Sequence, residues 1–121
     1  MIASLQRNHG RKWGYPLAAA LLCAGGLLCT GAGAIAAEKP AIHTVVIEGT
    51  NYAPATLTVK RGDTVVWMNK DPFPHTVTVK GVFDSHNIGA SRSWKYAARK
   101  TGEFNYICTL HPTMKGTLKV E

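Results

Sequence analysis

The stretch EFNYICTLHPTMKGTLKV, residues 103–120, contains two β-rich runs separated by a short connection with unusual chemistry. Residues 103–108 and 116–120 are rich in β-branched and aromatic side chains, a composition typical of β-strands. The connection CTLHPTM, residues 108–114, places a thiol, an imidazole and a thioether at intervals of three residues. We therefore predict a strand, a tight loop and a closing strand at this end of the chain.

The remainder of the chain from Ile42 onward has the same β-rich character. Five further runs alternate apolar and polar side chains or are rich in valine and threonine, and no window carries a sustained helical stripe. Turn signals such as Arg61-Gly62-Asp63 and Thr101-Gly102 separate them. The sequence thus predicts one small all-β domain, an antiparallel sandwich or a small barrel. The five predicted strands are residues 42–48, 56–60, 63–68, 75–79 and 93–97.

The first residues have the features of an export signal. A positively charged stretch precedes the apolar run of residues 17–29, which is too short and too interrupted by glycine to favour a membrane span. A small-x-small pattern at residues 34–36 predicts cleavage after Ala36, with Ala37 as the neighbouring alternative. We expect residues 1–36 to be a cleaved signal peptide, and a retained membrane anchor is the less favoured interpretation.

The predicted mature domain, residues 37–121, is mildly basic. The whole chain has a formal net charge of +7, and three of its cations, Arg7, Arg11 and Lys12, would leave with the leader. The remaining cations form no cluster, which argues against a nucleic-acid partner.

Cysteine usage restricts the chemistry further. Cys23 and Cys29 lie in the predicted leader, so Cys108 would remain alone. A single thiol in an oxidising compartment cannot form an internal disulfide. It is buried and inert, paired with another chain, catalytic, or bound to a metal.

The loop spacing favours metal binding. Residues i and i+3 of a β-turn approach within about 7 Å at Cα, and both Cys108 to His111 and His111 to Met114 are such spans. Two linked turns direct sulfur, nitrogen and sulfur toward one point. A continued strand would project Cys108 and His111 to opposite faces.

His75 is the candidate for a fourth ligand. It follows Pro72 and Pro74, which stiffen the connection and remove two backbone donors. A thiolate, two imidazoles and a weak axial thioether form a blue-copper set, whereas zinc has little use for methionine and iron–sulfur clusters need more thiolates.

Each candidate ligand, taken alone, has an ordinary structural explanation. A lone cysteine is more often a buried apolar residue, a lone methionine fills a core, and a lone histidine satisfies a backbone carbonyl. Their combination favours the metal site. We expect the other two histidines beyond the leader, His43 and His86, to be solvated.

These motifs resemble the cupredoxins, and among them the short-loop, amicyanin-like branch. The matching features are Trp67-x-Asn69, Pro74-His75, and the loop from Tyr106 through Cys108, His111 and Met114 to Lys115-Gly116. The resemblance implies a Greek-key β-sandwich holding one type 1 copper ion, with His75, Cys108 and His111 as equatorial ligands and Met114 as the axial ligand.

The resemblance also implies a role. Such proteins carry single electrons, and the edge of the loop histidine lies in an apolar patch, here Phe73, Pro74, Leu110 and Pro112 around His111. We expect a periplasmic monomer without a stable membrane anchor, whose partner is a c-type cytochrome or a periplasmic dehydrogenase or oxidase. No acid–base pair or activated nucleophile is evident, so we expect no enzymatic activity. The alternative is a periplasmic copper chaperone or storage protein.

The sequence departs from these relatives at two positions. Thr76 stands where an asparagine commonly ties the two ligand segments together. Leu110 stands where proline is frequent between the cysteine and the histidine, and its N–H could point at the Cys108 sulfur. A hydrogen bond to the sulfur withdraws charge from the thiolate and stabilises the reduced metal, so we hypothesise that Leu110 raises the reduction potential relative to Leu110→Pro.

Overall fold

The computed structural model describes residues 33, 34 and 36–121 of the 121-residue chain, so the predicted leader lies almost entirely outside the described residues. The described part forms β-strands and turns without a helix. It therefore contains no helix long and apolar enough to cross a membrane. The strands are β1 (Ile42–Glu48), β2 (Asn51–Ala53), β3 (Thr56–Val59), β4 (Thr64–Asn69), β5 (Thr78–Val79), β6 (Phe83–Asp84), β7 (Ser93–Ala97), β8 (Gly102–Ile107) and β9 (Lys115–Val120).

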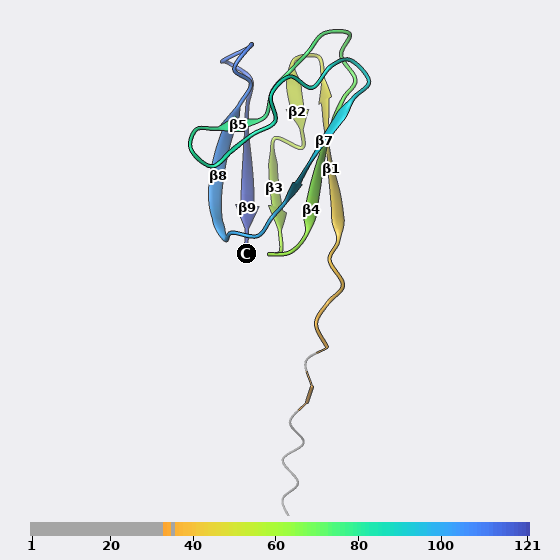
Figure 1. Cartoon of the computed structure of the whole chain (residues 1–121), viewed down its shortest axis with the longest axis vertical. Coiled ribbons are helices and arrows are strands. Elements are labelled where there is room, and N and C mark those ends of the chain that lie inside the picture. The colour runs from red at the N-terminus through yellow and green to blue at the C-terminus, as the bar shows by residue number, and fades with distance from the viewer. Residues whose placement is uncertain (1–32, 35) are drawn as a thin grey trace, which may run out of the picture. The chain divides into compact units, whose positions relative to one another are not determined.

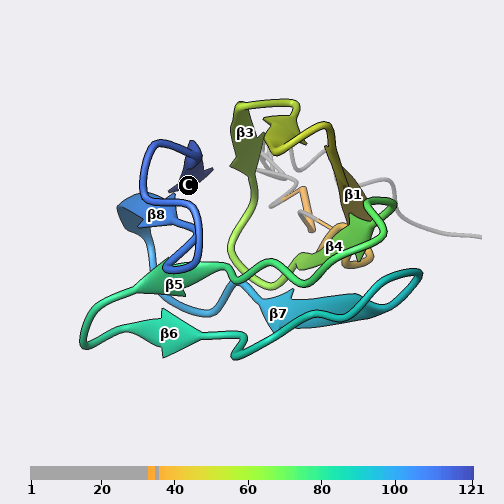
Figure 2. The same ribbon diagram turned by 90° about the horizontal axis from the view of Figure 1, so that it is seen from above.

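The strands form two sheets that pack as a sandwich, which confirms the predicted fold class. One sheet has the order β2-β1-β4-β7 and the other β3-β9-β8-β5-β6; Figure 2 shows β1, β4 and β7 on one side of the molecule and β3 and β8 on the other. The sheets are mixed rather than purely antiparallel, because β1 pairs parallel to β4 and β3 pairs parallel to β9. Between the two strands of each pair, the chain contributes at least one strand to the opposite sheet. It then returns to the first sheet in its original direction, so the paired strands are parallel.

The predicted strands are found with small shifts, and two observed strands were not predicted. Strands β2 and β6 have three and two residues, too few for a periodic pattern to be recognised. The predicted strand at residues 75–79 is regular only at Thr78–Val79. His75 instead forms an isolated bridge with Ile88.

The core lies between the sheets and is built on aromatic side chains. Trp67 is fully buried and its ring packs edge-on against Tyr106, with ring centroids 5.5 Å apart. Tyr106 in turn lies directly over Gly116, its partner across β8 and β9. A Cβ at position 116 would come within 2.3 Å of the Tyr106 ring, so only glycine permits this packing.

Both segments that carry predicted ligands leave the sandwich at the same end. The segment with His75 follows the last residue of β4, and the segment with Cys108 follows the last residue of β8. Figure 1 shows the connection between β8 and β9 at the end of the sandwich opposite the C-terminus. We call this end the site end.

Candidate metal centre

The loop from Cys108 to Met114 folds as two linked turns, as predicted. The N–H of His111 donates to the carbonyl of Cys108 at 3.2 Å, and the N–H of Met114 donates to the carbonyl of His111 at 2.9 Å. The N–H of Cys108 closes the loop by donating to the carbonyl of Met114 at 3.0 Å. Cys108 and Met114 are buried, at 0% and 3% exposure. The backbone itself therefore fixes the separation of the three candidate ligands.

The His75 segment is held by a different set of contacts. His75 is fully buried, and its backbone exchanges two hydrogen bonds with Ile88, at 3.1 and 2.8 Å. The side-chain amide of Asn69 donates to the carbonyl of Phe73 at 2.8 Å, and its oxygen accepts the N–H of Asp71 at 2.9 Å. Asn69 thus fastens the proline-rich connection to the end of β4.

Asp71 orients the His75 ring. Its Oδ2 lies 2.7 Å from Nε2 of His75. The same carboxylate accepts the backbone N–H groups of Gly49 and Thr50, at 2.7 and 3.0 Å. The hydrogen bond from the Thr50 N–H makes the largest contribution to lowering the pKa of Asp71 below its ordinary value. With Nε2 occupied by Asp71, Nδ1 is the ring nitrogen left for a metal.

Three ligand atoms converge on one point. The Sγ of Cys108 lies 3.7 Å from Nδ1 of His75 and 3.7 Å from Nδ1 of His111. All three ligand atoms lie within 4.8 Å of one another. Sulfur and nitrogen ligands about 2.3 and 2.0 Å from one ion, separated by an angle of about 120°, lie about 3.7 Å apart. The spacing fits a trigonal metal site, and Met114 is buried beside it.

The candidate site has the side chains that copper prefers. One cysteine sulfur and two imidazoles in a plane, with a thioether at a distance, suit both copper oxidation states. The set contains no carboxylate ligand and no second cysteine of the kind typical of structural zinc. His75, Cys108 and His111 are therefore able to hold a copper ion.

Thr76 ties the two ligand segments together, although it replaces the asparagine of relatives. Its N–H donates to the Sγ of Cys108 at 3.3 Å. Its hydroxyl accepts the N–H of Thr109 at 2.8 Å and lies 3.1 Å from the Thr109 hydroxyl. The hydroxyl thus performs the linking role that the sequence left in doubt.

Leu110 does not contribute the hydrogen bond that the sequence suggested. In the part of the chain that the structure describes, no hydrogen bond joins its N–H to the Cys108 sulfur, and the backbone donor is Thr76. The turn directs the N–H of His111 to the carbonyl of Cys108, and the Leu110 side chain is 47% exposed. Leu110 therefore belongs to the surface beside the site.

Tyr52 supports the site from the core. Its hydroxyl donates to the carbonyl of Thr76 at 2.5 Å. Burial, followed by the charges of Cys108 and Tyr106, raises the pKa of Tyr52 well above its ordinary value. Tyr52 is thus a neutral donor that holds the peptide beside the candidate ligand His75.

The two histidines predicted to be solvated have different environments. The side chain of His86 is 87% exposed, as predicted. The side chain of His43 is only 30% exposed, and its Nε2 lies 2.8 Å from Oδ2 of Asp63. Asp63 sits in the turn before β4, a neighbour that the alternation of β1 could not reveal.

Exposed apolar side chains lie near His111. Phe73 and Leu110 are 40% and 47% exposed, Pro74 and Pro112 are exposed, and His111 is half-buried. The rings of Phe73 and His111 have centroids 5.7 Å apart. We call these five residues the apolar patch.

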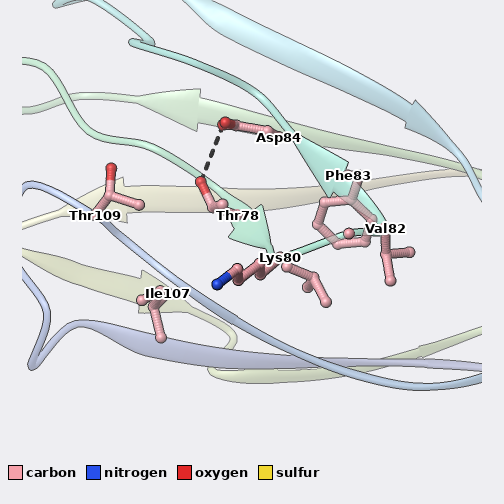
Figure 3. A pocket seen from close by; sticks show the side chains of 9 residues that line it. Thr78, Lys80, Val82, Phe83, Asp84, Ile107 and Thr109 are labelled. Atoms are coloured by element: carbon pink, nitrogen blue, oxygen red, sulfur yellow. Dashed lines mark hydrogen bonds between the residues drawn. The ribbon is translucent and has the colours of Figure 1, made fainter.

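A separate hollow of about 550 Å³ lies beside the hairpin of β5 and β6. Figure 3 shows Thr78 and Asp84 joined by a hydrogen bond, which measures 3.1 Å, with Thr109 on the same wall. None of the four predicted ligands lines this hollow. Among the described residues, the candidate metal ligands therefore lie outside this hollow. Thr109, which follows Cys108 in the chain, lines the hollow.

Comparison with known proteins places this geometry in a family. The model of the cupredoxin-like domain matches residues 18–120. The amicyanin of Paracoccus versutus is 33% identical over 93 residues, which cover 71% of this chain and 70% of that protein. A structure of an amicyanin mutant in its Cu(I) form is 32% identical, with a TM-score of 0.63, over 71% of this chain and 88% of that one.

The fold also occurs within a larger enzyme. A copper-containing nitrite reductase from Thermus scotoductus is 30% identical with a TM-score of 0.64, over 69% of this chain but only 23% of the reductase. The chain also matches amicyanins over most of their length, and the amicyanin of Paracoccus denitrificans, 33% identical, is covered over 92% of its length. The chain therefore belongs to the cupredoxin-like family, and its relatives include amicyanins.

Proposed function

We propose that this protein is a periplasmic electron carrier that shuttles one electron between redox proteins through a type 1 copper ion held by His75, Cys108, His111 and Met114. The observation that carries the proposal is the convergence of one sulfur and two imidazole nitrogens at 3.7 Å separations. Copper supplies the one-electron couple between Cu(I) and Cu(II) when it is bound there.

The residues around the ligands favour repeated electron transfer over release of the ion. Cys108 and His75 have no exposed surface. Asp71 holds the His75 ring, and Thr76 N–H holds the sulfur. Ligands fixed in this way move little when the charge of the ion changes, which lowers the cost of electron transfer. A copper chaperone needs ligands that an acceptor protein can reach and displace.

The apolar patch is the proposed docking surface. His111 is the one nitrogen ligand with exposed surface, and Phe73, Leu110 and the neighbouring prolines surround it. Burial of such a surface drives association without strong directional contacts, which suits partners that must dissociate quickly. We propose a c-type cytochrome or a periplasmic dehydrogenase or oxidase as partner, and a monomeric carrier.

The location follows from the predicted signal peptide, residues 1–36, with the cupredoxin domain at residues 37–121. An oxidising compartment suits a site with a single thiol that is protected by burial and by metal binding. Asp71, His75 and Cys108 lie in a row, but Cys108 and His75 have no exposed surface that a substrate could reach. All four proposed ligands are supplied by the chain, so we propose a carrier without enzymatic activity.

Copper titration of the purified protein tests the proposal. We expect one equivalent of Cu(II) to give an intense visible thiolate-to-copper band and a reversible one-electron wave in voltammetry. Thr113→Ala, which changes an exposed loop residue that is not a ligand, should preserve both. A colourless protein that yields its copper readily to a chelator would instead identify a chaperone or storage protein.

A further inference from the structure

A row of oxidisable aromatic side chains crosses the core away from the metal ligands. Ring centroids are 4.7 Å apart from Tyr52 to Tyr106, 5.5 Å from Tyr106 to Trp67, 5.5 Å from Trp67 to Trp94, and 6.0 Å from Trp94 to Tyr96. We call these five residues the aromatic relay. Each ring contacts the next, so the row has no gap that a phenylalanine or aliphatic side chain fills.

One end of the relay is connected to the Cys108 sulfur. The N–H of Thr76 donates to that sulfur at 3.3 Å, and the carbonyl of Thr76 accepts the Tyr52 hydroxyl at 2.5 Å. Hydrogen bonds and the Thr76 residue therefore form a continuous path from Cys108 to the first ring of the relay.

The other end reaches solvent away from the site end. On β4 and β7, Trp94 lies opposite Trp67, and Tyr96 lies opposite Val65. Asn69 marks the site end of β4, so the Val65–Tyr96 pair lies farther from the ligands than the Trp67–Trp94 pair. Trp94 and Tyr96 are half-buried, whereas Tyr52, Tyr106 and Trp67 are buried.

The reduction potentials of these side chains exclude them from electron exchange with redox partners. Tyrosine and tryptophan lose an electron only at potentials far above that of a cupredoxin copper ion. Electrons exchanged with redox partners therefore do not pass through these rings. A strong oxidant at the site end behaves differently from a redox partner. It removes an electron from a nearby group, and an aromatic ring can replace that electron. Without such a route, the electron vacancy left behind removes one electron from the Cys108 thiolate and leaves a thiyl radical. Further reaction with peroxide, which supplies the oxygen atoms, then gives sulfinic or sulfonic acid, and this oxidation is irreversible.

We propose that the aromatic relay carries a one-electron vacancy from the Cys108 end to Tyr96 and so protects the thiolate from over-oxidation. The oxidant is a peroxide-derived radical formed at the site end, which takes one electron and one proton to become water. Electrons move successively toward the site end, and Tyr96 supplies the last one. Its O–H proton goes to solvent, leaving a neutral tyrosyl radical that an external thiol reduces. The protective role rests on the proposed copper function, but the relay itself does not.

The surroundings of the rings favour this direction. The indole N–H of Trp67 is buried and has no hydrogen-bond partner among the described residues. The polar group beside it is the Tyr106 hydroxyl, which is also buried. A neutral phenol is a poor proton acceptor, so oxidised Trp67 keeps its proton and the vacancy is not trapped there. Tyr96 is half-buried and can release its proton to water. The O–H bond that breaks is therefore the one at the end of the relay.

A photo-oxidant at the site end tests the relay without any metal. The full chain with Cys23→Ser, Cys29→Ser and Thr113→Cys would be labelled at position 113 with a ruthenium polypyridyl maleimide, since Cys108 has no exposed surface. A flash in the presence of a cobalt(III) ammine, which accepts the excited electron, leaves Ru(III) beside the loop. We expect a tyrosyl radical in electron paramagnetic resonance, formed at Tyr96.

Matched variants distinguish the relay from other routes. Tyr96→Phe, a conservative change at a half-buried position, should abolish the tyrosyl signal, and Trp67→Phe should reduce its yield at least tenfold. Phe104→Leu, which alters an aromatic residue outside the relay, should leave the yield unchanged. An undiminished signal in Tyr96→Phe, or in Trp67→Phe with native circular dichroism, would overturn the proposal.

A second measurement tests protection. The copper(I) protein would be treated with hydrogen peroxide, and over-oxidised Cys108 would be quantified by mass spectrometry. We expect a several-fold larger over-oxidised fraction in Tyr96→Phe than in the unaltered protein, with Phe104→Leu as the control. Equal fractions would refute the protective role even if the flash experiment shows the radical. A protein that takes up no copper would refute the proposed carrier function, and the flash experiment would still decide the relay.

Discussion

The two ligand-bearing segments of this protein are fixed in opposite ways. The segment with His75 is buried and is held by side chains outside the ligand set, namely Asn69 and Asp71. The loop from Cys108 to Met114 is held by its own backbone turns, and residues 109–113 are at least partly exposed. The first segment therefore depends on particular side chains for its geometry. The second depends on loop length, and its side chains remain available for contact with a partner.

The largest expected effect is at the one atom that both segments face. Cys108→Ser replaces the thiolate by a hydroxyl, which is a poor ligand for Cu(I), and we expect complete loss of the intense visible band. Optical titration with Cu(II) checks this, with Thr113→Ala as the matched loop control. A variant that retains the band would show that the sulfur is not a ligand.

The next largest effect is expected in the His75 segment. Asp71→Asn keeps the size of the side chain but removes the charge that holds the His75 ring, and such changes cost about 10- to 100-fold in metal affinity. Competition with a copper chelator measures the loss. Asp84→Asn removes a carboxylate that does not contact His75 and should bind copper normally. Equal affinity in both variants would mean that burial alone orients the ring.

A smaller effect is expected where the two segments meet. Thr76→Val deletes the hydroxyl that accepts the Thr109 N–H, and an unpaired, partly buried donor costs about 1 kcal/mol of unfolding free energy. Thr76→Ser retains the hydroxyl and should restore most of that stability. Urea denaturation of the two metal-free variants measures this difference in stability. Similar unfolding midpoints for Thr76→Val and Thr76→Ser would show that the hydrogen bond between residues 76 and 109 does not contribute to stability.

The far end of the sandwich responds to acid. The Ala41 N–H, followed by the His43 side chain, lowers the pKa of Asp63 below its ordinary value of 3.8. A lowered folded pKa means that Asp63 contributes stability fully above pH 3.8, and this contribution is lost as the pH falls through the folded pKa. Asp63→Asn should therefore flatten the decline of the unfolding free energy below about pH 4. Glu103→Gln, an exposed acid on β8, is the control.

The smallest effect is expected at Leu110. Because the sulfur accepts its backbone hydrogen bond from Thr76, Leu110→Pro should leave the reduction potential of the copper form unchanged. Voltammetry of Leu110→Pro and of Leu110→Ala, which keeps the N–H, checks this. A lower potential in the proline variant alone would restore the sequence-based hypothesis.

The sequence predicted the features that depend on spacing along the chain. Cys108, His111 and Met114 lie three residues apart, and turn geometry alone brings such residues together. The longer strands were also recognised, since alternation over five or more residues is visible in one segment. Strand β6, with two residues, could not be recognised in this way.

The sequence could not predict features that depend on register between segments. The contact of Asp71 with Gly49 and Thr50 requires the turn after β1 to lie beside the end of β4. The parallel pairing of these strands produces that arrangement. The signal that could have identified Asp71 is a carboxylate four residues before a histidine in a proline-stiffened segment. The pairing of His43 with Asp63 was missed for the same reason.

The hydrogen bond to the sulfur comes from the main chain of residue 76, and this origin has a consequence for sequence drift. Every amino acid except proline supplies an amide proton at that position, so the electronic environment of the thiolate persists through most replacements. The side chain of residue 76 contributes instead to the cross-link with Thr109, which threonine makes with its hydroxyl. Exchange of Thr76 for an amide or another hydroxyl side chain should accordingly leave the colour of the copper form unchanged.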